Sequence, residues 1–122
     1  MKRIVVAGKE WRLRTLLRAQ LIEEGFEVEA HETVENAARS LARSRNLPLL
    51  VVADLSESEQ PLVDLGPLSA WAKLVPVWLL ASRTTLAEDA TQNRGFEKIF
   101  FRPIDLRALV LMIGERSESS PR

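Results

Sequence analysis

Three short, uninterrupted apolar runs most constrain how this chain folds, because each has the length and composition of a strand buried on both faces. They are Ile4–Ala7, Leu49–Ala53 and Val77–Leu80. Strands of this kind belong to parallel sheets, which carry helices on both faces. The segment Trp11–Glu24, which follows the first run, changes to the spacing of an amphipathic helix. The sequence therefore predicts strands and helices that alternate around a parallel sheet.

The remaining segments complete a predicted pattern of five strands and five helices. Further strands are expected over Phe26–Ala30, as a partly exposed edge, and over Lys98–Phe101. Helices are expected over Trp11–Glu24 before Gly25, from Thr33 past Leu41, over Leu68–Leu74, between about Thr84 and Asn93, and from Asp105 to about Ile113. Right-handed crossovers then give a three-layer, flavodoxin-like (βα)5 fold, a doubly wound parallel sheet with strand order 2-1-3-4-5.

Length and composition indicate one domain of ordinary globular character. The domain is expected over residues 1–114, and the polar stretch 115–122 is expected to be a flexible tail. Seventeen basic residues balance seventeen acidic ones, which argues against nucleic acid as a partner. The absence of cysteine excludes disulfides and thiolate chemistry. No signal-peptide core or membrane-span-length run occurs, so we expect a cytoplasmic protein with no membrane partner.

Polar residues at the predicted carboxyl ends of the strands are the candidates for a functional site. In doubly wound sheets, ligands and reactions are found at this edge, near the point where strand order reverses. The residues are Gly8, Lys9 and Glu10 after the first strand, Asp54 after the third, Ala81 and Ser82 after the fourth, and Arg102 and Pro103 after the fifth.

These strand ends resemble those of bacterial response-regulator receiver domains, the phosphorylation switches of two-component phosphorelays. The resemblance covers Lys2–Gly114. The segment Leu49–Leu55 resembles the strand that presents the phosphoacceptor aspartate, here Asp54. Pro76–Ser82 resembles the strand that ends in a hydroxyl residue, and Gly95–Leu106 resembles the last strand, its lysine-proline turn and the start of the last helix. The resemblance implies the receiver fold and a role in signal transduction.

The same resemblance implies that the phosphotransfer machinery of this chain is degenerate. In the family, two acidic residues after the first strand hold Mg²⁺, and they align here with Gly8 and Lys9. Glycine offers no ligand and an ammonium repels a divalent cation, so the Mg²⁺ site is predicted to be lost, with no other metal or cofactor. Glu10 remains beside it as a lone carboxylate.

Further family positions also differ. The hydroxyl residue aligns with Ala81, although a slip of one residue would place Ser82 there. The family lysine aligns with Arg102, and the peptide bond to Pro103 is expected to be cis, as in the family. Ile99 stands where the family has a switch aromatic. Because no base, nucleophile or metal constellation is complete, we expect no enzymatic activity and no catalytic residues.

Lys9 and Arg102 are both expected near Asp54, which suggests a fixed ion-pair cluster that holds one receiver conformation without phosphorylation. Two alternatives stay open: Asp54 is only a strand-end aspartate that caps a turn, or Lys9 points into solvent.

The leading functional hypothesis is a pseudo-receiver that signals through phosphorylation-independent protein–protein interaction. The expected partner is a histidine kinase or a downstream effector, or a second copy bound through the fourth helix, fifth strand and fifth helix. One alternative is a phosphoacceptor receiver that is phosphorylated on Asp54 with help from Glu10, Ser82 and Arg102. Another is a small-anion sensor in which Lys9 and Arg102 bind the ligand at the strand ends.

Overall fold

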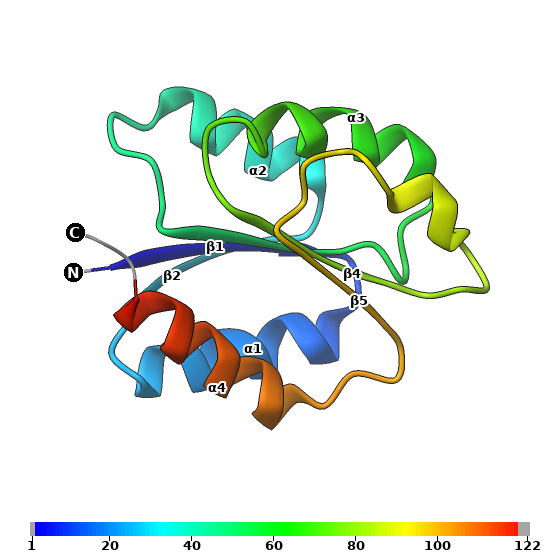
Figure 1. The fold of residues 1–122 in the computed structure, drawn as a ribbon. Helices are drawn as coiled ribbons and strands as arrows, with labels where there is room; N and C mark the ends of the chain where they lie inside the picture. Colours follow the sequence, from blue (N-terminus) through cyan, green and yellow to red (C-terminus); the bar gives the residue numbers. More distant parts are fainter. Residues whose placement is uncertain (1, 120–122) are drawn as a thin grey trace.

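A five-stranded parallel sheet lies between two layers of helices in the computed structural model, which describes residues 2–119 (Figure 1). The strands are β1 (Arg3–Gly8), β2 (Glu27–His31), β3 (Leu50–Asp54), β4 (Val77–Ala81) and β5 (Lys98–Phe101). The helices are α1 (Trp11–Glu23), α2 (Val34–Arg43), α3 (Pro61–Trp71) and α4 (Leu106–Glu118), with a short 3₁₀ helix, η1 (Glu88–Thr91). All neighbouring strands are parallel in the order β2-β1-β3-β4-β5, so the predicted flavodoxin-like fold is confirmed.

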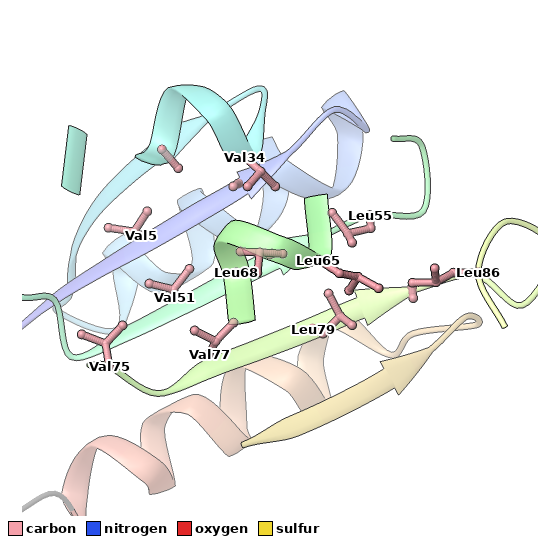
Figure 2. Close-up of a cluster of buried hydrophobic side chains, with 14 residues drawn as sticks. Val5, Val34, Val51, Leu55, Leu65, Leu68, Val75, Val77, Leu79 and Leu86 are labelled. Carbon is pink, nitrogen blue, oxygen red and sulfur yellow. The ribbon is translucent and has the colours of Figure 1, made fainter. Parts of the chain in front are cut away.

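The hydrophobic core consists of two apolar layers, one on each face of the sheet. Side chains alternate along each buried strand, so neighbouring residues enter opposite layers. The layer below α2 and α3 includes Val5, Val51, Val77, Leu79, Leu65 and Leu68 (Figure 2). The layer on the α1 and α4 face includes Ile4, Val6, Leu50, Val52, Trp78, Leu80, Leu17, Leu109 and Ile113. This double burial explains why the runs of β1, β3 and β4 contain no polar residue before the strand ends.

The predicted helix boundaries agree with the structure where a strong local signal marks them. Gly25 follows α1 with a φ of +96°, a conformation that glycine adopts without a Cβ clash. The Thr33 hydroxyl accepts a hydrogen bond from the N–H of Asn36 at the start of α2. The Asp105 carboxylate likewise accepts from Ala108 and caps α4.

The third helix begins earlier than predicted. The expected start near Leu68 is wrong, because α3 already begins at Pro61. Proline fits the first turn of a helix, because the N–H groups of this turn have no hydrogen-bond acceptor within the helix and the absence of one costs nothing. Pro67 lies inside α3 and removes the helical donor for the carbonyl of Val63. Val63 is solvent-exposed.

The predicted fourth helix is also wrong, since only η1 forms between Thr84 and Asn93. This segment contributes few buried side chains, with Leu86 and Thr91 as its buried residues. It therefore lacks the apolar stripe that stabilises a helix against the sheet. The backbone then leaves helical conformation, with positive φ angles at Asn93 and Gly95.

The last helix extends further than the predicted end near Ile113. α4 continues to Glu118, and Ser117 is buried. The Lys2 ammonium donates to the carbonyl and hydroxyl of Ser117 and ties the end of α4 to the start of β1. The rest of the expected tail, residues 120–122, lies outside the described residues. Among the helices in residues 2–119, none has the length and apolar character needed to cross a membrane.

A carboxylate joins β4, β5 and α4 and makes stability depend on pH. Glu97 accepts a hydrogen bond from the buried Trp78 indole at 2.9 Å and two from the Arg116 guanidinium at 2.7 and 3.1 Å. The Arg116 hydrogen bonds lower the pKa of Glu97 from the ordinary 4.5, and burial opposes them. The carboxylate therefore stabilises the fold fully above the unfolded-state pKa, and this contribution is lost as pH falls through the lower folded-state pKa.

We expect Glu97→Gln to lower the free energy of unfolding at neutral pH, because the charge-assisted pairing with Arg116 is lost. The deficit relative to wild type should shrink as the pH falls from 4.5 through the lower folded-state pKa, at which the wild-type carboxylate loses its own charge. Urea unfolding at a series of pH values measures both proteins. A deficit that stays constant down to strongly acidic pH would contradict this assignment.

Candidate functional site

The carboxyl ends of β1 and β3 meet closely at the centre of the sheet. Asp54 ends β3 opposite Gly8 of β1, and its residue surface is 5% exposed. A Cβ added to Gly8 would lie 3.0 Å from the Asp54 Cβ and 3.2 Å from the Asp54 carbonyl oxygen. The close approach of the two strands therefore favours a residue without a side chain at position 8.

Both carboxylate oxygens of Asp54 have hydrogen-bond donors. Oδ1 accepts from the Ser56 N–H at 3.1 Å and from the Ser56 hydroxyl at 2.6 Å. Oδ2 accepts from Nη2 of Arg102 at 3.3 Å. The contact with the N–H two residues ahead is an Asx turn, so the turn-capping interpretation of Asp54 describes part of its role. The aspartate is thus held from two directions.

Arg102 places its guanidinium between two carboxylates. It follows β5, and its backbone N–H donates to the carbonyl of Ala81 at the end of β4. The Arg102–Pro103 peptide is cis, as predicted. Nη2 lies 3.3 Å from Asp54 and 3.5 Å from Glu10, while Nε is buried without a hydrogen-bond partner. One cation therefore serves both acids, and we call Asp54, Arg102, Glu10 and Ser56 the strand-end cluster.

Glu10 connects this cluster to the first helix. Its carboxylate accepts hydrogen bonds from the N–H groups of Arg12 and Leu13 and so caps α1. Burial raises the pKa of Glu10, but the two N–H donors and Arg102 outweigh it and hold the pKa below the ordinary 4.5. Glu10 is therefore a charged structural group rather than a free carboxylate beside Asp54.

Lys9 does not join the cluster, so its expected ion pair with Asp54 is wrong. Its ammonium binds the Glu59 carboxylate at 2.7 Å, and both side chains are well exposed. The hydrogen bond that Lys9 donates to Glu59 raises the pKa of Lys9. The alternative of a solvent-directed Lys9 agrees better with the structure. Exposed ion pairs differ little in free energy, so a long, exposed lysine side chain can pair with any of several nearby carboxylates. In this structure Lys9 pairs with the exposed Glu59.

The other predicted site residues have structural roles at the same edge. Ala81 is fully buried in β4, and the hydroxyl of Ser82 contacts Thr84 at 2.7 Å rather than Asp54. Ile99 packs half-buried against the α2–α3 core layer. Pro103 is exposed after the cis peptide. Thus Asp54, Arg102 and Glu10 are brought together, while Ser82 and Ile99 are not in contact with the carboxylate.

Two residues that matter at this edge were missed by the sequence reasoning. Ser56 supplies two donors to Asp54, and an Asp-x-Ser sequence after a strand is a recognisable Asx-turn signal. Arg14 donates to the carbonyl of Gly8 at 2.6 Å and fixes the turn between β1 and α1. No local pattern predicts the second contact, because it depends on where α1 docks.

The residues around Asp54 do not fit a Mg²⁺ ion, the metal that the family resemblance implies. A Mg²⁺ site requires several oxygen ligands arranged in near-octahedral geometry. Here Gly8 has no side chain, Lys9 is cationic, and the Arg102 guanidinium occupies the space beside Oδ2. Within residues 2–119, no group of three or more acidic, histidine or cysteine side chains is arranged to hold a metal.

Solved structures with the same fold are response-regulator receiver domains. The receiver domain of the Francisella response regulator 1452 matches with a TM-score of 0.77 and 14% identity, covering 97% of this chain and 98% of that one. A CheY-like receiver domain protein from Methanospirillum hungatei matches with a TM-score of 0.75 and 18% identity, over 98% and 99% of the two chains. The receiver domain of NtrX from Brucella abortus matches with a TM-score of 0.75 and 22% identity, over 96% and 99%.

No family model matches the sequence, and no curated protein matches it either. The chain therefore has the receiver-domain fold, with sequence identities that establish the fold alone.

Proposed function

We propose that this chain is a pseudo-receiver: a cytoplasmic signal-transduction module that acts through protein–protein interaction without phosphorylation, Mg²⁺ or enzymatic activity. The observation that carries the proposal is the pairing of Asp54. Its two oxygens accept from Ser56 and Arg102, and its surface is almost fully removed from solvent. A phosphoacceptor needs a free carboxylate oxygen in line with the phosphoryl donor. In this protein, Oδ1 of Asp54 accepts hydrogen bonds from Ser56 and Oδ2 accepts one from Arg102, so neither oxygen is without a donor.

Electrostatics support the same proposal. Phosphoryl transfer places several negative charges beside the aspartate, and a divalent cation normally neutralises them. Among the described residues, the cation that contacts Asp54 is Arg102, and Arg102 is shared with Glu10. The carboxylate of Glu10 caps α1 and cannot be released without loss of its backbone donors. The site therefore suits one fixed state better than a switch between two.

The proposed partners are a histidine kinase, a downstream effector or a second copy of this chain. The surface expected to contact them is formed by η1, β5 and α4. The sequence-based alternative of an anion sensor is not favoured, because Lys9 and Arg102 already face carboxylates. An incoming anion would have to displace Glu59 from one and Asp54 or Glu10 from the other.

We expect the wild-type protein to remain unmodified by acetyl phosphate in the presence of Mg²⁺. Intact-mass measurement after incubation is the readout, with Asp54→Asn as the matched variant and a Mg²⁺-dependent receiver treated in parallel to prove the reagent active. Beryllofluoride should likewise cause no saturable change in tryptophan fluorescence, for which Trp11 is well placed beside Arg102. Mg²⁺-dependent modification that disappears in Asp54→Asn would overturn the proposal in favour of a phosphoacceptor.

A further inference from the structure

The outward face of α3 differs from those of the other helices because it carries no charge. Leu65 and Leu68 point from α3 into the core (Figure 2). The solvent-exposed residues of the helix are Leu62, Val63, Gly66, Pro67 and Ala70. Its one charged residue, Asp64, is half-buried and accepts a hydrogen bond from the Ser58 hydroxyl at 2.6 Å. The solvent therefore meets an apolar surface along the whole of α3.

The other three helices expose charged side chains in the same environment. Arg18 is exposed on α1, Arg39 on α2 and Arg107 on α4. A surface helix normally has a polar face toward solvent, and a helix that is apolar all round is normally buried. The composition of α3 is therefore that of a helix with a partner on its outward side.

The apolar surface is continuous along one line of the helix. Leu62 and Val63 are 62% and 63% exposed, and Leu74, in the turn after α3, is 66% exposed. Leu62, Gly66 and Ala70 follow one another at intervals of four residues, so they lie above one another on the helix. We call Leu62, Val63, Gly66, Pro67, Ala70 and Leu74 the α3 face. Single exposed apolar residues are common, but a contiguous apolar patch marks a contact site.

The α3 face is complementary to itself. A surface without charge requires a partner surface without charge, because burying an unpaired charge is costly. Among the helices in residues 2–119, α3 alone presents such a surface.

The sizes of the side chains on the α3 face also match in an antiparallel pair centred on Gly66. Leu62 of each copy then lies opposite Ala70 of the other, so a large side chain meets a small one. Gly66 weakens the helix, yet an added Cβ would meet nothing within 4 Å in the chain itself. Its lack of a side chain instead allows the two helices to approach closely.

We propose that a second copy of this chain covers the α3 face, with the two α3 helices antiparallel about a two-fold axis at Gly66. Charges at the ends of the helix support this orientation. Glu59 precedes α3 and Lys73 follows it, both are exposed, and both are equally far along the sequence from Gly66. In the pair, Lys73 of each copy therefore approaches Glu59 of the other, whereas parallel helices would bring like charges together.

The proposed contact is small and separate from α4. An interface of one helix from each copy falls among the smaller specific interfaces, so the association is expected to be weak and reversible. The α3 face lies on the opposite side of the sheet from α4 (Figure 1), so a dimer formed through it leaves α4 free for a further partner.

Sedimentation velocity with a matched pair of lysine substitutions tests the contact. Wild type should show a concentration-dependent monomer–dimer equilibrium. Ala70→Lys places a charge within the α3 face and should raise the dimer dissociation constant by about tenfold or more. Ala19→Lys makes the same change at an exposed position of α1, in the opposite helical layer (Figure 1), and should leave the constant unchanged. A wild-type protein that stays monomeric into the millimolar range overturns the inference, as does an equal effect of the two substitutions.

Disulfide cross-linking tests the position of the axis, because the chain contains no cysteine of its own. A residue on the two-fold axis faces its own counterpart, and a disulfide forms between residues whose Cα atoms are about 4.4–6.8 Å apart. Under a mild copper–phenanthroline oxidant, Gly66→Cys should give a covalent dimer, and Ala19→Cys should not. Equal cross-linking of both, or of neither, overturns the arrangement. The state of Asp54 enters neither measurement, so failure here leaves the pseudo-receiver proposal standing.

Discussion

Replacing Arg102 with methionine is expected to lower the free energy of unfolding by about 2 kcal/mol. The substitution keeps much of the side-chain volume but removes the cation that Asp54 and Glu10 share. Asp54 is then left almost fully buried with only its Ser56 donors. Removing one partner of a fully buried ion pair costs more, about 3–5 kcal/mol, but the Arg102 side chain is 36% exposed and its contacts are long. Urea unfolding measured by tryptophan fluorescence gives the value.

Two comparisons separate this effect from a general loss of surface charge. Arg39→Met removes an exposed pair with Glu35 within α2 and should cost no more than about 0.5 kcal/mol. In an Asp54→Asn background, Arg102→Met should cost about 1 kcal/mol less than in wild type, because the buried charge has already been removed. If the Arg102 substitution costs the same in both backgrounds, the guanidinium does not stabilise the Asp54 carboxylate.

Introducing an acidic residue at position 8 is expected to destabilise the fold by about 3 kcal/mol rather than create a metal site. Any Cβ at this position presses on the Cβ and the carbonyl oxygen of Asp54. In Gly8→Asp, a second carboxylate is also forced beside Asp54 without a further cation. Unfolding experiments on three variants separate the contributions to the lost free energy of unfolding. Gly8→Ala reports the Cβ contact, Gly8→Asn adds the larger side chain, and Gly8→Asp adds the charge. The loss of stability is expected to increase in that order.

Gly114→Ala provides the matched control for glycine replacement. Gly114 lies within α4, and an added Cβ meets nothing within 4 Å. This substitution should stabilise the protein by about 0.5–1 kcal/mol, because alanine favours the helix. If Gly8→Ala behaved in the same way, the close contact between β1 and β3 would not limit the residue at position 8.

The sheet could be predicted from the sequence because a strand buried on both faces is an uninterrupted run of apolar residues. The runs of β1, β3 and β4 contain only apolar residues before their ends, and the structure puts both faces of each under helices. The start of α3 and the loss of the fourth helix could not be predicted with equal success. Both depend on how much apolar surface a short segment buries against the sheet, which propensity and proline positions do not determine.

The site was predictable to the level of the backbone but not of every side chain. Topology brings residues at strand ends together, so the approach of Arg102 to Asp54 follows from their positions after β5 and β3. The direction of Lys9 does not follow, because several carboxylates surround it, including Glu32, Glu57 and Glu59. The competition among exposed partners is decided by small differences in geometry, and these arise only once the loops are placed.

The tight contact between Gly8 and Asp54 also limits which substitutions the fold tolerates at position 8. A Mg²⁺-binding receiver would need carboxylates where Gly8 and Lys9 stand, and the first of these collides with the strand that carries Asp54. Natural domains have a free energy of unfolding of only about 5–15 kcal/mol. A variant destabilised at position 8 is therefore expected to be less abundant in the cell. An acidic residue at position 8 therefore requires concerted changes in β1 and β3. A single substitution at position 8 without a compensating change in β3 is expected to give a less stable fold.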